Sequence, residues 1–216
     1  MGTFKLYTGI FEQLTTAPGN DQLTLTRVET KYGKDFTAFL YRPRIDEILK
    51  DDLLLFLEPR ETYNGFFDND HWQQKHPFNF PGPFYTGESD SCCTGDAEAP
   101  DNVMYDENGY EYIFKQPKNF EQLLGVVGAA AVEVFDGYSC NGNQYWTYAL
   151  CKEWWQNMGD MIAQLNSPEV KKVNGDRIQL YLSYLSSEAE LDLRRYCFFL
   201  ENNYYPADDY IRLPLL

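Results

Sequence analysis

Short runs of alternating apolar and polar residues dominate the first 66 positions of the chain and predict strands. The clearest is DQLTLTRVET, in which leucine alternates with threonine at the period of two that a strand requires. One segment differs, because Ile45, Ile48 and Leu49 recur at helical spacing and predict a short helix over residues 44–52. The predicted strands cover residues 4–10, 21–30, 35–43 and 53–59.

The segment NVMYDENGYEYIFKQP predicts a β-hairpin near residues 102–116. Two apolar runs flank Asn108 and Gly109. An Asn-Gly pair is a strong signal for a type I′ turn, because both central residues of that turn need positive φ. Pro117 ends the second strand, since proline has no N–H to donate to a sheet.

Helical spacing takes over after residue 117, with N-cap candidates at Asn119, Thr147 and Ser187. Glu190 stands at the capping-box position relative to Ser187. The helix that follows Thr147 has one apolar face, formed by Leu150, Trp154, Met158, Ile162 and Leu165.

Strands first and helices later predict an α+β fold with a mixed or antiparallel sheet. We expect one domain over residues 1–216, strand-rich in 1–116 and helical in 117–216. The chain ends in an apolar tail, which we expect to dock on the body of the protein.

No period is sustained from residue 63 to residue 100, where Gly, Pro, Asn, Asp and Ser dominate. A loop this long is usually functional or disordered. Many aromatic residues are embedded in it, and they must either pack on the body or present a surface. A second aromatic loop, YSCNGNQYWT, precedes the helix after Thr147. Its Tyr145 and Trp146 either pack as a lead-in to that helix or join the first loop in one acidic, aromatic face.

The net charge is −15, and its distribution along the chain is uneven. Residues 67–111 hold 10 acidic residues and 1 basic residue, a net charge of −9, whereas the flanking parts carry −2 and −4. Such a field repels nucleic acid and phosphate-rich membranes. It attracts a basic protein, so we expect a basic protein partner and no direct contact with nucleic acid.

Neither a membrane span nor a secretory signal is evident in the sequence. The longest apolar run, residues 53–57, is far shorter than a bilayer requires. The first residues do not have a basic segment followed by an apolar one. Five cysteines without an export signal predict reduced thiols in the cytoplasm. We interpret Cys151 and Cys197, which lie in helical patterns, as small core residues.

Catalytic chemistry finds little support in the residue pattern. A zinc site would need paired ligands, but the chain has no C-x-x-C, and adjacent cysteines rarely bind one ion together. A thiolate enzyme would need a cationic environment, whereas the negative field here raises the pKa of a thiol. Nucleotide-binding motifs are absent. We therefore expect no metal and no cofactor. A metal- or thiol-dependent enzyme remains an alternative, built on His71, His76, Cys92, Cys93 and Cys140.

The sequence favours a non-catalytic acidic binding protein of the inhibitor or immunity type. Such a protein presents carboxylates where a basic target, for example a nucleic-acid-processing toxin or defence enzyme, expects phosphates. A structural subunit of a larger assembly is a further alternative, and the sequence does not predict an oligomeric state. The candidate partner-binding residues are Asp68, Asp70, Trp72, Phe84, Tyr85, Glu88, Asp90, Asp96, Glu98, Tyr145 and Trp146.

Overall fold

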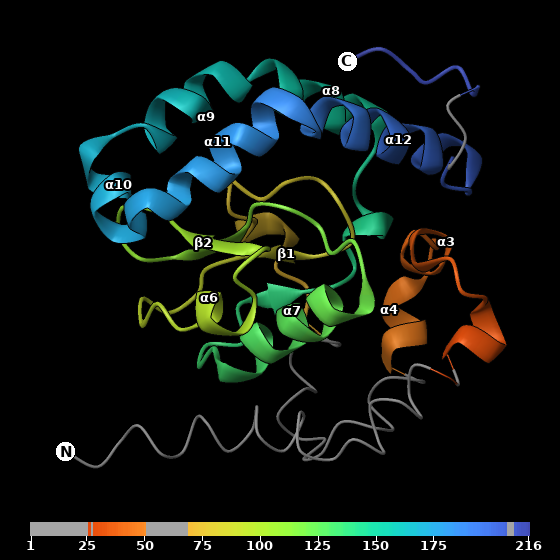
Figure 1. Cartoon of the computed structure of the whole chain (residues 1–216), viewed down its shortest axis with the longest axis horizontal. Coiled ribbons are helices and arrows are strands. Elements are labelled where there is room, and N and C mark those ends of the chain that lie inside the picture. The colour runs from red at the N-terminus through yellow and green to blue at the C-terminus, as the bar shows by residue number, and fades with distance from the viewer. Residues whose placement is uncertain (1–25, 27, 51–68, 207–209) are drawn as a thin grey trace.

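The computed structural model of the chain describes residues 26, 28–50, 69–206 and 210–216 (Figure 1). Two of the predicted strands, residues 4–10 and 53–59, lie outside these residues. Among the described residues, no helix combines the length and the apolar character that crossing a bilayer requires.

The described residues among the first 50 are mostly helical, so the strand predicted over 35–43 is wrong, and so is the strand predicted over 21–30 at its described residues. Thr26 and residues 28–32 are helical, and α3 (Phe36–Leu40) replaces the strand predicted over 35–43. Asp35 caps α3 by accepting a hydrogen bond from the Ala38 N–H at 3.1 Å. This cap and the burial of Phe39 and Leu40 outweigh a short alternating pattern.

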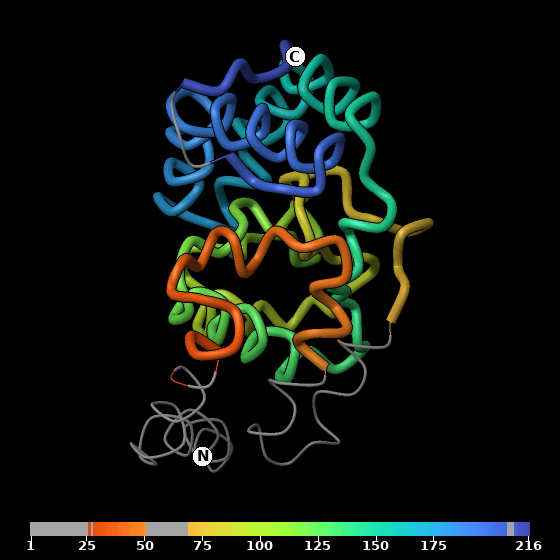
Figure 2. The backbone as a smooth tube through the Cα atoms, turned by 90° about the vertical axis from the view of Figure 1, so that its right-hand side faces the viewer, coloured from red at the N-terminus to blue at the C-terminus, as the bar shows by residue number. Residues whose placement is uncertain are grey.

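The short helix predicted over residues 44–52 is confirmed as α4 (Ile45–Ile48). In Figure 2 the segment that carries α3 and α4 runs between α7 (Phe120–Val132) and the C-terminal helices. Phe36 packs edge-on against Phe120 of α7, with ring centres 4.9 Å apart. Tyr41 stacks on Tyr205, with ring centres 4.1 Å apart.

The hairpin prediction is confirmed by the antiparallel strands β2 (Val103–Tyr105) and β3 (Glu111–Ile113). The predicted type I′ turn is wrong. Gly109 has φ +87°, but Asn108 is not among the non-glycine residues with positive φ, whereas a type I′ turn needs both. The Asp106 carboxylate accepts hydrogen bonds from the N–H groups of Asn108 (2.8 Å) and Tyr110 (2.9 Å). These bonds hold Asn108 in a conformation without positive φ.

A second small antiparallel sheet pairs β1 (Tyr85–Thr86) with β4 (Tyr138–Ser139). The fully buried amide of Asn79 joins the two sheets. Its Oδ1 accepts from the N–H of Thr86 (3.2 Å) and of Ile113 (2.8 Å), and its Nδ2 donates to the carbonyl of Thr86 (2.8 Å). Gln116 donates to the carbonyls of Phe80 and Phe84 in the same way.

These amides explain why the segment around residues 76–84 shows no period in the sequence. Side-chain amides, rather than a strand ladder, satisfy many of its buried backbone groups. The segment is therefore ordered without being regular.

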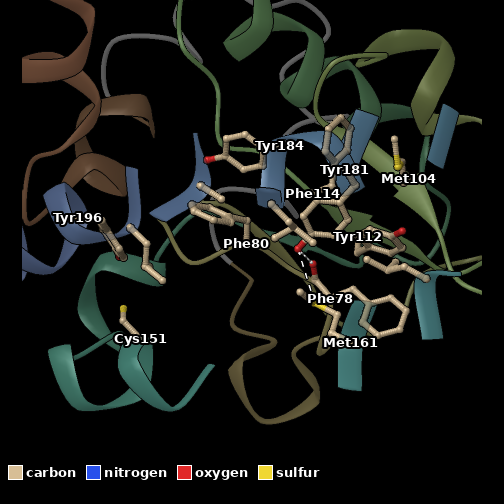
Figure 3. Close-up of a cluster of buried hydrophobic side chains, with 14 of the residues drawn as sticks. Phe78, Phe80, Met104, Tyr112, Phe114, Cys151, Met161, Tyr181, Tyr184 and Tyr196 are labelled. Atoms are coloured by element: carbon tan, nitrogen blue, oxygen red, sulfur yellow. Dashed lines mark hydrogen bonds between the residues drawn. The ribbon is translucent and has the colours of Figure 1, made fainter. Parts of the chain in front are cut away.

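Helices cover both faces of the two small sheets (Figure 1). Val103 and Ile113 point into a hydrophobic cluster with α3, α6 (Gly95–Glu98) and α7. Met104 and Tyr112, one position along, point into a second cluster with the C-terminal helices. The alternation of a strand thus sends neighbouring side chains into two different cores. Figure 3 shows the aromatic side chains of the second cluster, among them Phe78, Phe80, Tyr112 and Tyr181.

The C-terminal part is helical, as predicted. Asn119 caps α7 and Thr147 caps α8, each by accepting a hydrogen bond from the N–H three residues ahead. The predicted Ser187 cap is wrong, because Ser187 is the last residue of α11 and donates to the Ser183 carbonyl at 2.7 Å. The helix predicted to follow Thr147 is broken at Asn157 into two. The elements here are η4 (Gly142–Gln144), α8 (Tyr148–Gln156), α9 (Met158–Leu165), α10 (Pro168–Asn174), η5 (Gly175–Arg177), α11 (Ile178–Ser187) and α12 (Ala189–Asn202).

The apolar tail docks on the body, as predicted. Arg194 of α12 donates through Nε to the carbonyl of Pro214 at 2.8 Å. The Tyr148 hydroxyl of α8 donates to the carbonyl of Leu215 at 2.5 Å. Leu216 packs against the second hydrophobic cluster. The end of the chain is thereby held against α8 and α12.

Candidate functional site

A groove with a volume of about 380 Å³ opens between the segment 72–78 and the helices α8 and α9. Aromatic and apolar side chains make most of its wall, and two carboxylates belong to it. We call it the aromatic groove. Its lining residues are Trp72, Lys75, Pro77, Phe78, Trp146, Leu150, Glu153, Trp154, Asn157, Asp160, Met161 and Gln164.

Trp72, in η3 (Trp72–Gln74), unites the two aromatic loops. Its indole stacks on Tyr145 with ring centres 5.1 Å apart and planes 15° apart. It meets Trp146 edge-on at 5.1 Å and Tyr85 edge-on at 5.6 Å. The two aromatic loops therefore adjoin in space, and their rings form one continuous cluster.

Asp70 lies at the junction of the two loops. Its carboxylate accepts a short hydrogen bond from the Tyr145 hydroxyl and a longer one, 3.4 Å, from the Tyr85 hydroxyl. The bond from Tyr145 is the main reason why the pKa of Asp70 is lowered. Asp70 is exposed and, at neutral pH, negatively charged beside the aromatic cluster.

Among the described residues that line the aromatic groove, Lys75 supplies the one basic side chain. Its Nζ lies 4.7 Å from the centre of the Trp146 ring and 5.3 Å from that of Trp72, within the range of cation–π attraction. Burial lowers the pKa of Lys75. Glu153 and Asp160, both exposed, place carboxylates on the opposite wall. The aromatic groove therefore offers aromatic faces and negative charge together.

The floor of the aromatic groove is held by hydrogen bonds to backbone carbonyls. Trp154 Nε1 donates to the carbonyl of Pro77 at 3.1 Å. The hydroxyl of the buried Tyr181 donates to the carbonyl of Phe78 at 2.9 Å and also contacts the Met161 sulfur at 3.7 Å (Figure 3). These contacts fix the segment 77–78 against α8, α9 and α11 and preform the groove.

A different set of acidic residues is buried. Asp90, Glu111 and Glu133, which we call the buried carboxylate cluster, are at most 4 % exposed. Glu133 accepts hydrogen bonds from the N–H groups of Asp90 (2.7 Å) and Gly137 (2.5 Å). These carboxylates bind backbone N–H groups, so they build turns and are not available to a partner.

Glu111 is the most deeply buried member of the buried carboxylate cluster, with none of its surface exposed. Burial raises its pKa from 4.5 to about 7, although hydrogen bonds from the Tyr138 hydroxyl (2.5 Å) and the Gly95 N–H (2.8 Å) act in the opposite direction. The negative charges of Asp90 and Glu133 add to the increase.

Four of the predicted partner-binding residues lie in or beside the aromatic groove, and the structure brings them together. These are Asp70, Trp72, Tyr145 and Trp146. The sequence analysis did not include Lys75, Glu153, Trp154 and Asp160 among the partner-binding residues. Only their closeness in sequence to the aromatic loops, or to the apolar face of the helix after Thr147, could have suggested them. Leu150 and Trp154, which the sequence places on one apolar helix face, both line the groove.

Of the other predicted residues, Tyr85 packs against Trp72 beneath the groove, and the rest are dispersed. Phe84, Tyr85 and Asp90 are at most 3 % exposed and offer no surface to a partner. Asp96 forms an ion pair with Arg177, and Glu98 is partly buried, which raises its pKa. These acids therefore do not form one docking surface. Glu88 is exposed, and Asp68 lies outside the described residues.

The cysteines and histidines of the alternative enzymatic site have separate surroundings. His71 donates to the carbonyl of Asp136 at 2.8 Å, and His76 lies 3.4 Å from the carboxylate of Asp106. Cys140 is buried in the first hydrophobic cluster. All five cysteines are described, and none of them forms a disulfide. Within the described ranges, no three His, Cys, Asp or Glu side chains gather as metal ligands would.

The two adjacent cysteines are poorly suited to act as nucleophiles. A hydrogen bond to Asp90 and its negative charge raise the pKa of the Cys92 thiol. Burial, followed by the charges of Glu111 and Asp96, raises the pKa of Cys93. Both shifts have the direction expected from the acidic sequence around them. Cys151 and Cys197 are buried in the second hydrophobic cluster, as predicted.

Comparison of the chain with protein-family models, with curated proteins and with solved structures finds no match. The function is therefore argued from the site itself.

Proposed function

We propose that the protein is a non-catalytic binding protein that holds a basic segment of a protein partner in the aromatic groove and thereby blocks that partner. The observation that carries the proposal is the union of the two aromatic loops by the Trp72–Tyr145 stack beside the charged Asp70. Large rigid aromatic side chains provide much of the energy of protein interfaces. The adjoining carboxylates select a partner of opposite charge.

The wider charge distribution supports a basic partner. Residues 76–114 contain eight acidic residues and residues 119–151 contain three, and neither stretch contains a lysine or arginine. These two stretches form both small sheets, α6 and α7. A surface built from them attracts a cationic protein over a distance and accelerates its association, most strongly at low salt.

The aromatic groove suits an arginine side chain of the partner. A guanidinium group stacks on aromatic faces and forms paired hydrogen bonds with carboxylates. The Lys75 ammonium lies over the Trp72 and Trp146 rings, so the arginine takes the place of Lys75 on these faces. Glu153 and Asp160 provide the carboxylates on the opposite side. A target that uses this arginine to bind phosphate would be inhibited when the arginine is held in the groove.

The test begins with capture of binding proteins from the native host by the immobilised full chain, followed by kinetics with the purified captured protein. The groove variant carries Glu153→Lys and Asp160→Lys. The control carries Glu169→Lys and Asp176→Lys, which change the net charge equally at exposed positions of α10 and η5. We expect a basic partner, and an association rate about tenfold lower for the groove variant than for the control at low salt.

Two outcomes would refute the proposal. One is capture of proteins without basic character. The other is equal association rates for the groove variant and its charge-matched control, which would leave only a general attraction between opposite charges.

A further inference from the structure

The loop between α7 and β4 exposes two apolar side chains. Val134 is 63 % exposed and Phe135 is 68 % exposed. Among the described large hydrophobic residues, only Tyr210 and Leu215 in the C-terminal tail are more exposed. We call residues Val134, Phe135 and Asp136 the tip. Exposed apolar side chains in adjacent positions commonly mark an interaction site.

The tip is fixed by hydrogen bonds to its backbone. The Val134 N–H donates to Asp90 Oδ2 at 3.0 Å, and the Phe135 N–H donates to Glu133 Oε1 at 3.1 Å. The carbonyl of Asp136 accepts from Asn69 Nδ2 at 2.6 Å and from His71 Nε2 at 2.8 Å. Elements far apart in the sequence therefore hold this one short loop.

The conformation of the tip is also costly in itself. Asp136 has φ +54°, in the left-handed region that non-glycine residues seldom adopt. Asp90 and Glu133, which hold the tip, are 3 % and 4 % exposed, and burial of a carboxylate is unfavourable unless it is well paired. The tip buries neither Val134 nor Phe135 in return. The arrangement makes sense if it holds these two side chains ready for a partner, because preorganisation reduces the entropy lost on binding.

The surroundings of the tip are acidic. Asp136 itself and Glu88 are exposed. Glu88 lies close by, because Gly87 donates to the carbonyl of Gly137 at 2.8 Å and a Cβ on Gly137 would come within 2.6 Å of the Glu88 carbonyl oxygen. The two stretches without lysine or arginine, residues 76–114 and 119–151, include all of these positions except Asn69 and His71.

We propose that the tip is a preorganised anchor: Val134 and Phe135 enter an apolar pocket, edged by lysine or arginine side chains, on a protein partner. The apolar pair supplies the contact area, and Glu88 and Asp136 select the basic edge by charge complementarity. The basic character of the partner rests on the proposed function, but the tip is a surface separate from the aromatic groove. An anionic bilayer is disfavoured as an occupant, because these carboxylates would face its negative surface.

The experiment places the photocrosslinking amino acid p-benzoylphenylalanine at position 135 of the full chain, in the native host. The control carries the same amino acid in place of Leu180, which is 49 % exposed on α11. We expect an adduct with a basic protein that forms at position 135 and not at position 180. Glu88→Lys should reduce its yield, whereas Glu169→Lys on α10 should leave it unchanged.

Affinity measured with the purified adduct partner completes the test. Phe135→Ala should weaken binding about tenfold or more, as for a central interface anchor, while Leu180→Ala has little effect. Thermal unfolding should be the same for Phe135→Ala and the wild type, since the side chain is exposed. The proposal is overturned if no adduct is specific to position 135, if the adduct is a second copy of this chain or a lipid, or if Phe135→Ala binds with unchanged affinity.

The same affinity measurement separates this inference from the proposed function. If the Glu153→Lys, Asp160→Lys variant loses binding and Phe135→Ala binds normally, the proposal for the groove is supported and the proposal for the tip is rejected. The reverse pattern would support the proposal for the tip and reject the proposal for the groove.

Discussion

The carboxylate of Asp70 beside the aromatic groove and that of Glu111 in the buried carboxylate cluster behave in opposite ways. Asp70 is exposed, its pKa is lowered by the Tyr145 hydroxyl, and it is charged at neutral pH. Glu111 is buried and its pKa is raised to about 7. Both belong to the one acidic interval of the sequence. The number of acidic residues in an interval therefore says little about the number that face a partner.

The largest effect should come from a carboxylate that holds backbone N–H groups. Glu133→Ala leaves the N–H groups of Asp90, Phe135 and Gly137 without their acceptor. We expect the free energy of unfolding, measured in urea, to fall by about 4 kcal/mol. Glu107→Ala, at an exposed position of the hairpin turn, is the control and should change it by less than about 0.5 kcal/mol. A small loss for Glu133→Ala would mean that this carboxylate does not build the loop.

The second effect is a dependence of stability on pH. In the folded protein Glu111 has a pKa of about 7, against 4.5 ordinarily. Between these values the folded state binds more protons than the unfolded state. The contribution of Glu111 to stability is therefore complete below pH 4.5 and is lost as the pH rises through 7.

Glu111→Gln removes this titration while keeping the size of the side chain. The stability of the variant relative to the wild type should increase between pH 5 and pH 8, by up to about 3 kcal/mol. Urea unfolding across this pH range measures it, with Glu107→Gln as the control. Parallel pH profiles of Glu111→Gln and the wild type would contradict the assignment.

The smallest effect on stability is expected at the aromatic groove. Tyr145→Phe removes the hydroxyl that donates to Asp70 but keeps the ring that stacks on Trp72. The free energy of unfolding should fall by less than about 1 kcal/mol, because the bond is exposed. The pKa of Asp70, followed by NMR of its carboxyl carbon, should rise toward the ordinary value. A large loss of stability would mean that the Tyr145–Asp70 hydrogen bond supports the fold, as the buried carboxylate cluster does.

The parts of the fold that depend on local chemistry were predictable. The Asn108–Gly109 pair located the hairpin, and Asn119 and Thr147 located two helix starts, because each signal acts within a few residues. The predicted turn type was wrong because the Asp106 side chain accepts a hydrogen bond from the Asn108 N–H. The strand predicted over 35–43 failed because a cap at Asp35 and packing on Phe120 favoured a helix.

The candidate site was only partly predictable, for a related reason. The meeting of the two aromatic loops was expected as one possibility, and the Trp72–Tyr145 stack fulfils it. The roles of individual acids were not predictable, because each depends on a distant group. Asp90 accepts from the N–H of Val134, which is 44 positions away in the sequence. No local pattern distinguishes such a carboxylate from an exposed one like Glu88.

The composition of the aromatic groove has a spectroscopic consequence. The chain has four tryptophans, and Trp72, Trp146 and Trp154 all line this groove. Intrinsic fluorescence therefore originates largely at the groove. Any molecule that enters it displaces water from indole rings and alters their emission, so occupancy can be followed in the unlabelled wild-type protein.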